Sequence, residues 1–437
     1  MSPRAIYFLW LGFYIAEQAW LTALAALNLR HVRRHATEIP PAFAGAVDPG
    51  TRTRSVAYTL ERGRFGVLAS LVSAGLVAAA VSAGFLGLLD DACARLPLGP
   101  LLLEAAFVLA ASICSWLANL PFSLYATFSI EARFGFNRTT PKTFALDTLK
   151  GLALSLLIGL PVLLGLFWFM DRAGALWWVW AFLALTAFEL VMNLLYPLVI
   201  APLFNRFTPL AEGTLRDRIL DLARRLAFRT RGIFVMDASR RSRHGNAYFT
   251  GLGPVKRVVL FDTLVGTMNE EEILAVLAHE IGHSLRHHVR KSLAVSIALG
   301  LAGFWVLSLL VPWTPLYEAF GFGRASSHAI LVVLSIAASP FTFPFRPLAS
   351  LWSRRHEYEA DRFAVDGTGG AQGMISALLR LSKDNLTNLT PHPWYSFYHY
   401  SHPTTAERVA ALEAYAAMKS ASASAPASQA NASPTRP

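Results

Sequence analysis

Residues 148–200 read TLKGLALSLLIGLPVLLGLFWFMDRAGALWWVWAFLALTAFELVMNLLYPLVI, two long apolar runs separated only by Asp171-Arg172-Ala173-Gly174. Each run is longer than the roughly 20 residues that a helix needs to cross the hydrocarbon core of a bilayer. We therefore predict two membrane helices, Thr148–Met170 and Ala175–Ile200, joined by a short polar turn.

The composition of the whole chain agrees with this prediction. Of the 437 residues, 54% are hydrophobic and 15% are charged, whereas soluble domains carry about 25% charged residues. So little polar material excludes a disordered protein, a nucleic-acid-binding arm and most cytosolic enzymes. The formal net charge of +11 does not indicate a nucleic-acid partner, because the basic residues are spread over loops between apolar segments. The lipid bilayer is the predicted partner.

Seven apolar segments have the length of a membrane span. They are Ala5–Leu27, Gly66–Leu89, Leu101–Tyr125, Thr148–Met170, Ala175–Ile200, Ser292–Val311 and Ser327–Ser350. A cleaved signal peptide is the alternative for the first, but its apolar run is longer than a signal core of 7–15 residues and only Arg4 precedes it.

The distribution of Arg and Lys predicts the orientation. The loop after the first segment and the stretch Ala201–Lys291 are strongly basic, whereas the loops around Asp90–Gly99, Asp171–Gly174 and Trp313–Ser326 each carry one Arg. Seven spans then place the N-terminus outside and the C-terminus in the cytoplasm. The expected divisions are five spans in 1–200, a cytoplasmic segment in 201–291, two spans in 292–350, helices in 351–418 and a disordered tail in 419–437.

The segment 201–291 is expected to combine helices and strands. Its predicted elements are an amphipathic helix at Thr214–Ala227 and strands at Ile233–Met236, Asn246–Gly251 and Arg257–Phe261, the last two paired as a hairpin through Leu252-Gly253-Pro254-Val255. Asn269, with Glu272 three residues later, has the pattern of a capping box and predicts the start of another helix.

That helix carries His279-Glu280-Ile281-Gly282-His283. Residues i and i+4 share a helix face, so His279 and His283 can reach one metal ion, and Glu280 lies beside them as a candidate general base. The chain has two cysteines, too few for a cysteine-rich metal site. We therefore predict a zinc ion held by His and carboxylate groups, although Co²⁺ or Mn²⁺ suits the same donors.

A catalytic zinc needs a third protein ligand. The zincin class with a third His six residues after the second is excluded, because Val289 occupies that position and Arg286 replaces its Gly. His287 and His288 are expected on the same helix, at i+4 and i+5 from His283, and we expect them to be solvated or near lipid headgroups.

The stretch His356-Glu357-Tyr358-Glu359-Ala360-Asp361 is the better source. Glu357 and Asp361 share a helix face, which suits a ligand carboxylate and a second carboxylate that orients a ligand His. Glu359 is expected to face elsewhere. The alternative is that Glu357 only pairs with Arg354 or Arg355 on the surface.

Several further motifs accompany these residues. They are Phe134-Gly135-Phe136-Asn137, the run Ile200–Leu210, Asn246-Ala247-Tyr248-Phe249-Thr250-Gly251, the run Lys256–Leu264, and His402-Pro403 with Arg408 beyond. With the His279–His283 motif and Glu357–Asp361, they make the sequence resemble the integral-membrane CAAX prenyl protease 1 family of gluzincin zinc endopeptidases.

The resemblance implies one Zn²⁺ held by His279, His283 and Glu357, with Glu280 as general base. It implies that Asp361 orients a ligand, and that His402 and Arg408 lie near the scissile carbonyl. The implied fold is a mainly α-helical multi-pass membrane protein, with seven helices around a chamber and a small α+β zincin-like domain on the cytoplasmic side.

The strand at Asn246–Gly251 is a candidate for substrate binding. Peptides commonly bind zincins by adding a strand to an exposed sheet edge, and Asn246 and Ala247 would supply part of that edge. The alternative is a plain hairpin strand.

The expected activity is hydrolysis of peptide bonds, and the resemblance implies release of the aaX tripeptide from prenylated C-a-a-X proteins. The alternatives are a broad-specificity quality-control protease of membrane proteins and a zinc-binding chaperone or transporter without hydrolysis. Glu280 argues against the last, because metal binding alone needs no base. The Arg/Ala/Leu-rich composition favours a bacterial inner membrane, with the endoplasmic reticulum as the eukaryotic counterpart. Four polar residues inside the spans have no assigned role: Glu17, Glu104, Glu189 and Asn193.

Overall fold

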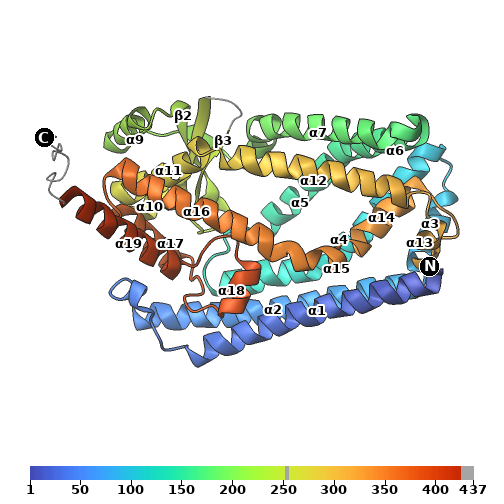
Figure 1. The fold of residues 1–437 in the computed structure, drawn as a ribbon, viewed down its shortest axis with the longest axis horizontal. Helices are drawn as coiled ribbons and strands as arrows, with labels where there is room; N and C mark the ends of the chain where they lie inside the picture. Colours follow the sequence, from blue (N-terminus) through green and yellow to red (C-terminus); the bar gives the residue numbers. More distant parts are fainter. Residues whose placement is uncertain (251–254, 425–437) are drawn as a thin grey trace, which may run out of the picture.

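A computed structural model describes residues 1–250 and 255–424, and these residues are mainly helical (Figure 1). The helices are α1 (Pro3–Arg34), α2 (Pro49–Ser82), α3 (Phe85–Ala94), α4 (Pro100–Tyr125), α5 (Pro141–Leu154), α6 (Leu160–Arg172), α7 (Trp177–Leu195), α8 (Ala201–Phe204), α9 (Thr214–Arg225), α10 (Asp262–Thr267), α11 (Glu270–Leu285), α12 (His288–Leu310), α13 (Thr314–Ala319), α14 (Ser327–Ala337), α15 (Ser339–Thr342), α16 (Arg346–Thr368), α17 (Gln372–Asp384), α18 (Pro393–His399) and α19 (Thr405–Ser424). The last helix runs past Lys419, where we expected disorder to begin.

Among the described residues, five helical stretches are long and apolar enough to cross a membrane: Pro49–Ser82, Pro100–Glu131, Pro141–Arg172, Gly174–Phe204 and His288–Leu310. A sixth is formed if Ser327–Ala337 and Ser339–Thr368, bent by 46°, count as one span. Pro340 lies at that bend and cannot donate a helical hydrogen bond. These stretches overlap six of the seven predicted segments.

The remaining predicted span, Ala5–Leu27, lies inside α1. This helix has 32 residues, but Glu17 and Gln18 interrupt its apolar run and it does not reach the hydropathy of the other spans. Glu17 is buried and accepts a hydrogen bond from Ser339 at the bend (2.5 Å). The prediction of seven spans is therefore confirmed only for five or six, with α1 packed along α2 (Figure 1).

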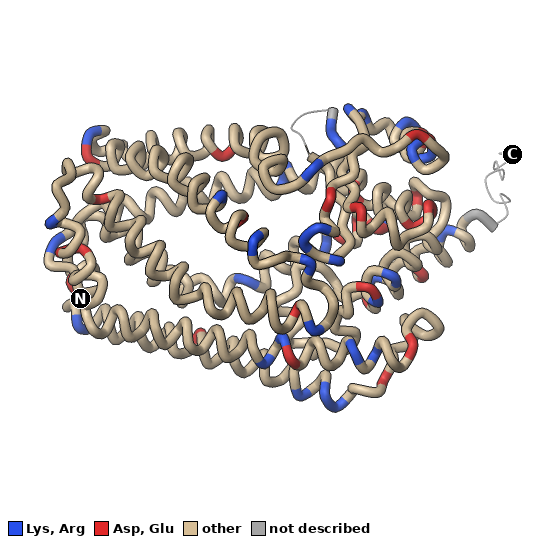
Figure 2. The backbone as a smooth tube through the Cα atoms, turned by 180° about the vertical axis from the view of Figure 1, so that it is seen from behind, with Lys and Arg blue, Asp and Glu red and all other residues tan. Residues whose placement is uncertain are grey.

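The outer surface of the spans is apolar. At most 11% of the residues in the five apolar windows are buried inside the protein, so lipid must cover them. Figure 2 shows Lys, Arg, Asp and Glu gathered mainly toward the two ends of the long axis. This distribution is that of an integral membrane protein.

One end of the molecule holds a four-stranded sheet of order β1-β2-β4-β3. The strands are β1 (Phe207–Pro209), β2 (Arg229–Met236), β3 (Ala247–Thr250) and β4 (Val255–Phe261). β3 and β4 pair antiparallel, with Ala247 opposite Leu260, which confirms the predicted hairpin pairing. The turn predicted at Leu252-Gly253-Pro254-Val255 lies almost wholly outside the described residues. β3 is at the edge of the sheet.

The helix α11 lies in the apolar core of this end. Asn269 and Glu272 form the predicted capping box, and the next turns bury Ile273, Leu277 and Ala278 against α9, the sheet and α17. Gly282 is where α16 comes closest: a Cβ there would lie 3.1 Å from Phe363 Cβ and 3.2 Å from Ala360 Cα. This close approach places α16 directly beside the His279–His283 face.

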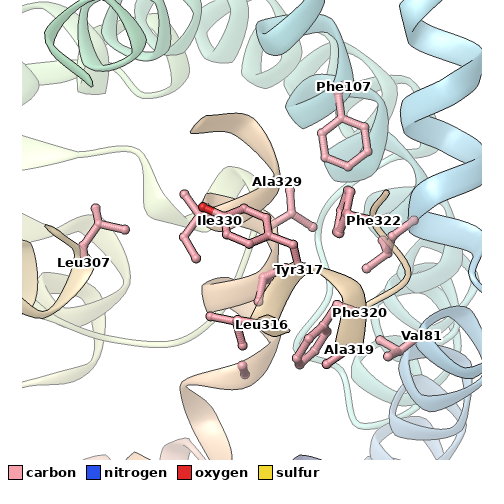
Figure 3. Close-up of a cluster of buried hydrophobic side chains, with 14 of the residues drawn as sticks. Val81, Phe107, Leu307, Leu316, Tyr317, Ala319, Phe320, Phe322, Ala329 and Ile330 are labelled. Atoms are coloured by element: carbon pink, nitrogen blue, oxygen red, sulfur yellow. The ribbon is translucent and has the colours of Figure 1, made fainter. Parts of the chain in front are cut away.

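A separate apolar core lies at the opposite end, around α13 and α14. Tyr317, Phe320, Ala329 and Ile330 are its buried centre, and Phe107 of α4 packs against them (Figure 3). Large buried side chains there pack α1, α4 and α14 against one another.

Candidate active site

Two histidines of α11 provide the first pair of potential metal ligands. His279 and His283 lie one turn apart, with their Nε2 atoms 3.1 Å from each other and their ring centres 4.8 Å apart. Both Nε2 atoms point to the same place, as the i, i+4 spacing predicted.

Glu357 of α16 completes a group of three. Its Oε2 lies 3.5 Å from Nε2 of His279, and its Oε1 lies 3.3 Å from Nε2 of His283. Its side chain is only 5% exposed, so the alternative of a surface pair with Arg354 or Arg355 is not what the structure has. Arg354 donates instead to backbone carbonyls of Ser396, Phe397 and Tyr400.

The separations test whether a metal ion fits. Zinc in tetrahedral coordination, with bonds of about 2.0–2.1 Å, keeps neighbouring ligand atoms about 3.3 Å apart. The two Nε2 atoms are 3.1 Å apart, and each lies 3.3–3.5 Å from a different oxygen of Glu357. One ligand atom from each residue lies within 4.8 Å of the others. Two imidazoles and one carboxylate are also the donor set of a common class of catalytic zinc site. The residues fit a metal ion.

Asp361 and Arg408 surround the His279 side of this group. Asp361 Oδ1 lies 2.8 Å from Nδ1 of His279, and Arg408 donates to Asp361 through Nε (2.8 Å) and Nη2. Nη1 of Arg408 lies 3.4 Å from Glu357 Oε2. All four side chains are buried, so Arg408 offsets two carboxylate charges that water does not reach.

His402 is exposed and Glu280 is partly buried. Nδ1 of His402 is 2.9 Å from Glu357 Oε2, while its side chain is 63% exposed and lines a cavity of about 1050 Å³ between α1, α2 and the segment before α19. Burial raises the pKa of the Glu280 carboxyl above its ordinary value, against the opposing effect of His279 and His283. Of the two side chains, His402 lines the cavity, while Glu280 follows His279 directly on α11.

The candidate substrate strand is also at an edge. Asn246 is exposed and its backbone carbonyl accepts from the Phe261 N–H of β4 (3.0 Å). The Ala247 N–H points away from that ladder and takes the Asn246 side-chain Oδ1 as acceptor (2.8 Å). β3 packs against α11, so this edge and the metal-ligating helix belong to one unit.

The expectation for His288 is wrong. α11 ends at Leu285, His287 adopts a left-handed backbone (φ 59°), and a new helix begins at His288. The turn brings His288 back over His283 and buries it to 3% exposure, whereas His287 is exposed as expected. Glu359, which we expected to face elsewhere than Glu357 and Asp361, contacts His288.

The unassigned polar residues of the spans lie away from this site. Glu17 bonds Ser339, Glu104 lies near His328 at the opposite end, and the Asn193 side chain donates to the backbone carbonyl of Glu189 (3.2 Å). Glu17 and Asn193 thus make hydrogen bonds between and within helices.

Comparisons with known proteins agree with this arrangement. Residues 28–206 match the model of the CAAX prenyl protease N-terminal region with five membrane helices, and residues 209–416 match peptidase family M48. The CAAX prenyl protease 1 homolog of Arabidopsis thaliana is 36% identical over 92% of this chain and 96% of its own length. CAAX prenyl protease 1 of Saccharomyces cerevisiae is 32% identical over 92% of this chain and 94% of its own.

A solved structure has the same fold. The crystal structure of S. mikatae Ste24p covers 93% of this chain and 99% of its own, with a TM-score of 0.87 and 32% sequence identity. Membership of a peptidase family disfavours a chaperone or transporter without hydrolysis. Because the matches extend over nearly the whole chain and agree with one another, the chain belongs to the CAAX prenyl protease 1 family and is an integral-membrane metalloprotease.

Proposed function

We propose that this protein is a zinc endopeptidase that removes the last three residues of prenylated proteins ending in C-a-a-X. The names of its relatives support this substrate class. The observation that carries the chemistry is the convergence of His279, His283 and Glu357 on one point.

His279, His283 and Glu357 would hold a zinc ion, which would supply Lewis-acid polarisation of the scissile carbonyl and a more acidic water. Glu280 accepts the proton of that water and returns it to the leaving amine nitrogen. The raised pKa of the Glu280 carboxyl suits both steps, because a general acid–base group works best when its pKa is close to the working pH.

His402 and Arg408 stabilise the charge that develops on the carbonyl oxygen. His402 lines the cavity, from which it would donate to the carbonyl oxygen. Arg408 adds positive charge next to Glu357, since its Nη1 lies 3.4 Å from Glu357 Oε2. Fixed donors of this kind act where the charge of the transition state appears.

The substrate backbone binds along β3. A peptide lying antiparallel or parallel to this edge exchanges hydrogen bonds with Ala247, whose N–H is satisfied only by the neighbouring Asn246 side chain. The strongly basic segments support a cytoplasmic location for this end of the protein and, with seven spans, an N-terminus outside.

Cleavage of a farnesylated C-a-a-X peptide by the detergent-purified protein tests this function. It is measured with and without a chelator, beside Glu280→Gln, with the metal content of each sample determined. We expect chelator-sensitive release of the tripeptide by the native protein, and none by a fully zinc-loaded Glu280→Gln. Full zinc occupancy without cleavage of this or unprenylated peptides would refute the proposed activity, and absence of bound metal would refute the site.

A further inference from the structure

Glu359 of α16 and His288 of α12 form a chain of polar contacts that ends on His283 of α11, a candidate metal ligand. Nδ1 of His288 lies 3.0 Å from Nδ1 of His283, and Nε2 of His288 lies 3.0 Å from Oε2 of Glu359. The ring of His356 stacks on His288, with centres 4.0 Å apart and planes 8° from parallel. None of these contacts is used in the mechanism above.

The hydrogen-bonding chemistry of this chain allows one assignment of protons when His283 binds a metal. A carboxylate only accepts, so the proton between Glu359 and His288 sits on Nε2 of His288. A neutral His288 then has a lone pair on Nδ1, and it accepts from the Nδ1–H of His283. His283 is left with its lone pair on Nε2, the atom that faces His279 and Glu357.

We propose that Glu359 and His288 are positioning residues that hold His283 in the tautomer and ring orientation required for metal binding. This inference rests on the metal site of the proposed function. His288 acts through His283 and does not touch the metal or the substrate.

The two ligand histidines are thus oriented in different ways from the same helix. His279 donates directly to Asp361 of α16 (2.8 Å), whereas His283 reaches Glu359 of α16 only through His288. The side chain of His283 is also more exposed than that of His279, 20% against 7%. An exposed ring that no neighbour holds would spend time in orientations that cannot ligate, so its partner matters for affinity.

The test measures metal affinity, which does not depend on turnover. Zinc is titrated into the metal-free, detergent-purified full chain at constant neutral pH, in competition with a chromophoric chelator. The variants are His288→Phe, which keeps a flat ring for stacking but removes both nitrogens, and Glu359→Leu. Loss of such outer partners weakens metal binding about 10–100-fold, and we expect His288→Phe to fall in that range.

Three further measurements separate positioning from packing. His356→Phe keeps the stacked ring outside the proton chain and should bind zinc as the native protein does. His288→Gln keeps one acceptor and one donor and should recover most of the affinity. The double variant His288→Phe with Glu359→Leu should be no weaker than His288→Phe alone, because both remove the same chain.

The outcomes distinguish this inference from the proposed function. If the native protein binds zinc and His288→Phe binds it equally well, the positioning role is wrong and the zinc site stands. If His356→Phe loses as much affinity as His288→Phe, packing rather than proton placement is responsible. If the native protein itself binds no zinc, the proposed function fails first.

Discussion

Two buried clusters of histidine and carboxylate lie at opposite ends of the molecule, and they are built differently. At the end with the sheet, His279, His283 and Glu357 direct three ligand atoms to one point. At the other end, His328 of α14 lies between Asp90 of α3, 2.9 Å from Nε2, and Glu104 of α4, 3.8 Å from Nδ1.

The surroundings of the clusters differ as well. The three candidate metal ligands are flanked by Asp361, Arg408 and His402, which supply hydrogen bonds and charge. His328 sits beside Phe107 in the apolar core of Figure 3, with ring centres 5.1 Å apart. Histidine and carboxylate side chains thus suit a metal ion where their ligand atoms converge, as in His279, His283 and Glu357. His328 instead has a carboxylate near each ring nitrogen and links α14 to α3 and α4.

The largest effect that we predict is the loss of metal in His279→Ala. Removing one of three ligands should reduce bound zinc to background and lower kcat/KM by about 10³-fold or more, since the metal supplies several kcal/mol of transition-state stabilisation. The matched change at the other end, His328→Ala, should keep full metal content. Metal analysis of both purified variants checks this, and loss of zinc from His328→Ala would remove the distinction between the clusters.

Glu272 should make the stability of the metal end depend on pH. Burial alone would raise its pKa, but hydrogen bonds from Ser376, Arg380 and the Asn269 N–H hold the pKa below the ordinary value of 4.5. A lowered pKa stabilises the fold above pH 4.5, and that stabilisation is lost as the pH falls below it.

The variant Glu272→Gln should therefore unfold more easily at neutral pH, by about 1.5–3 kcal/mol, the value of hydrogen bonds to a buried charge. Its difference from the native protein should shrink as the pH drops below 4.5. Unfolding followed in detergent at pH 7 and pH 4 measures this, and a difference independent of pH would contradict the assignment.

Gly282→Ala should separate the two helices that carry the metal ligands. Its Cβ would lie within 3.2 Å of Ala360 Cα, and overpacking of this kind costs about 1–3 kcal/mol. Gly303→Ala in α12 is the control, because a Cβ there meets nothing within 4 Å and the substitution favours the helix. Thermal unfolding and zinc affinity of the two variants are compared, and equal values would show that the close approach is unimportant.

The smallest effect is expected for Asp90→Ala. His328 loses its nearer carboxylate partner, and an unsatisfied buried group costs about 1–3 kcal/mol, here at the lower end because Ser326 also lies 3.1 Å from the same nitrogen. Stability should fall while zinc content and kcat stay at native values. A loss of zinc would show that the two ends are coupled.

Local sequence patterns were sufficient for much of the fold. The apolar runs predicted the five or six spans, because a span needs only length and hydropathy. The capping box predicted the start of α11, and the i, i+4 spacing predicted that His279 and His283 share a face. The capacity of α1 to cross the membrane was not decided by these rules, because Glu17 lowers its hydropathy and finds its partner, Ser339, 322 residues away.

The sequence alone therefore determined the membrane class, the candidate pair of histidine ligands and the candidate base, all of which depend on neighbours within a turn or a span. Tertiary structure decided which carboxylate completes the site, because Glu357 reaches His279 only through the close packing of α16 on Gly282. It also decided that His288 contacts His283, since the helix breaks at His287 and Glu359 lies 71 residues further along the chain. Contacts of that kind depend on where a helix ends and on what packs against it, and no local pattern contains either.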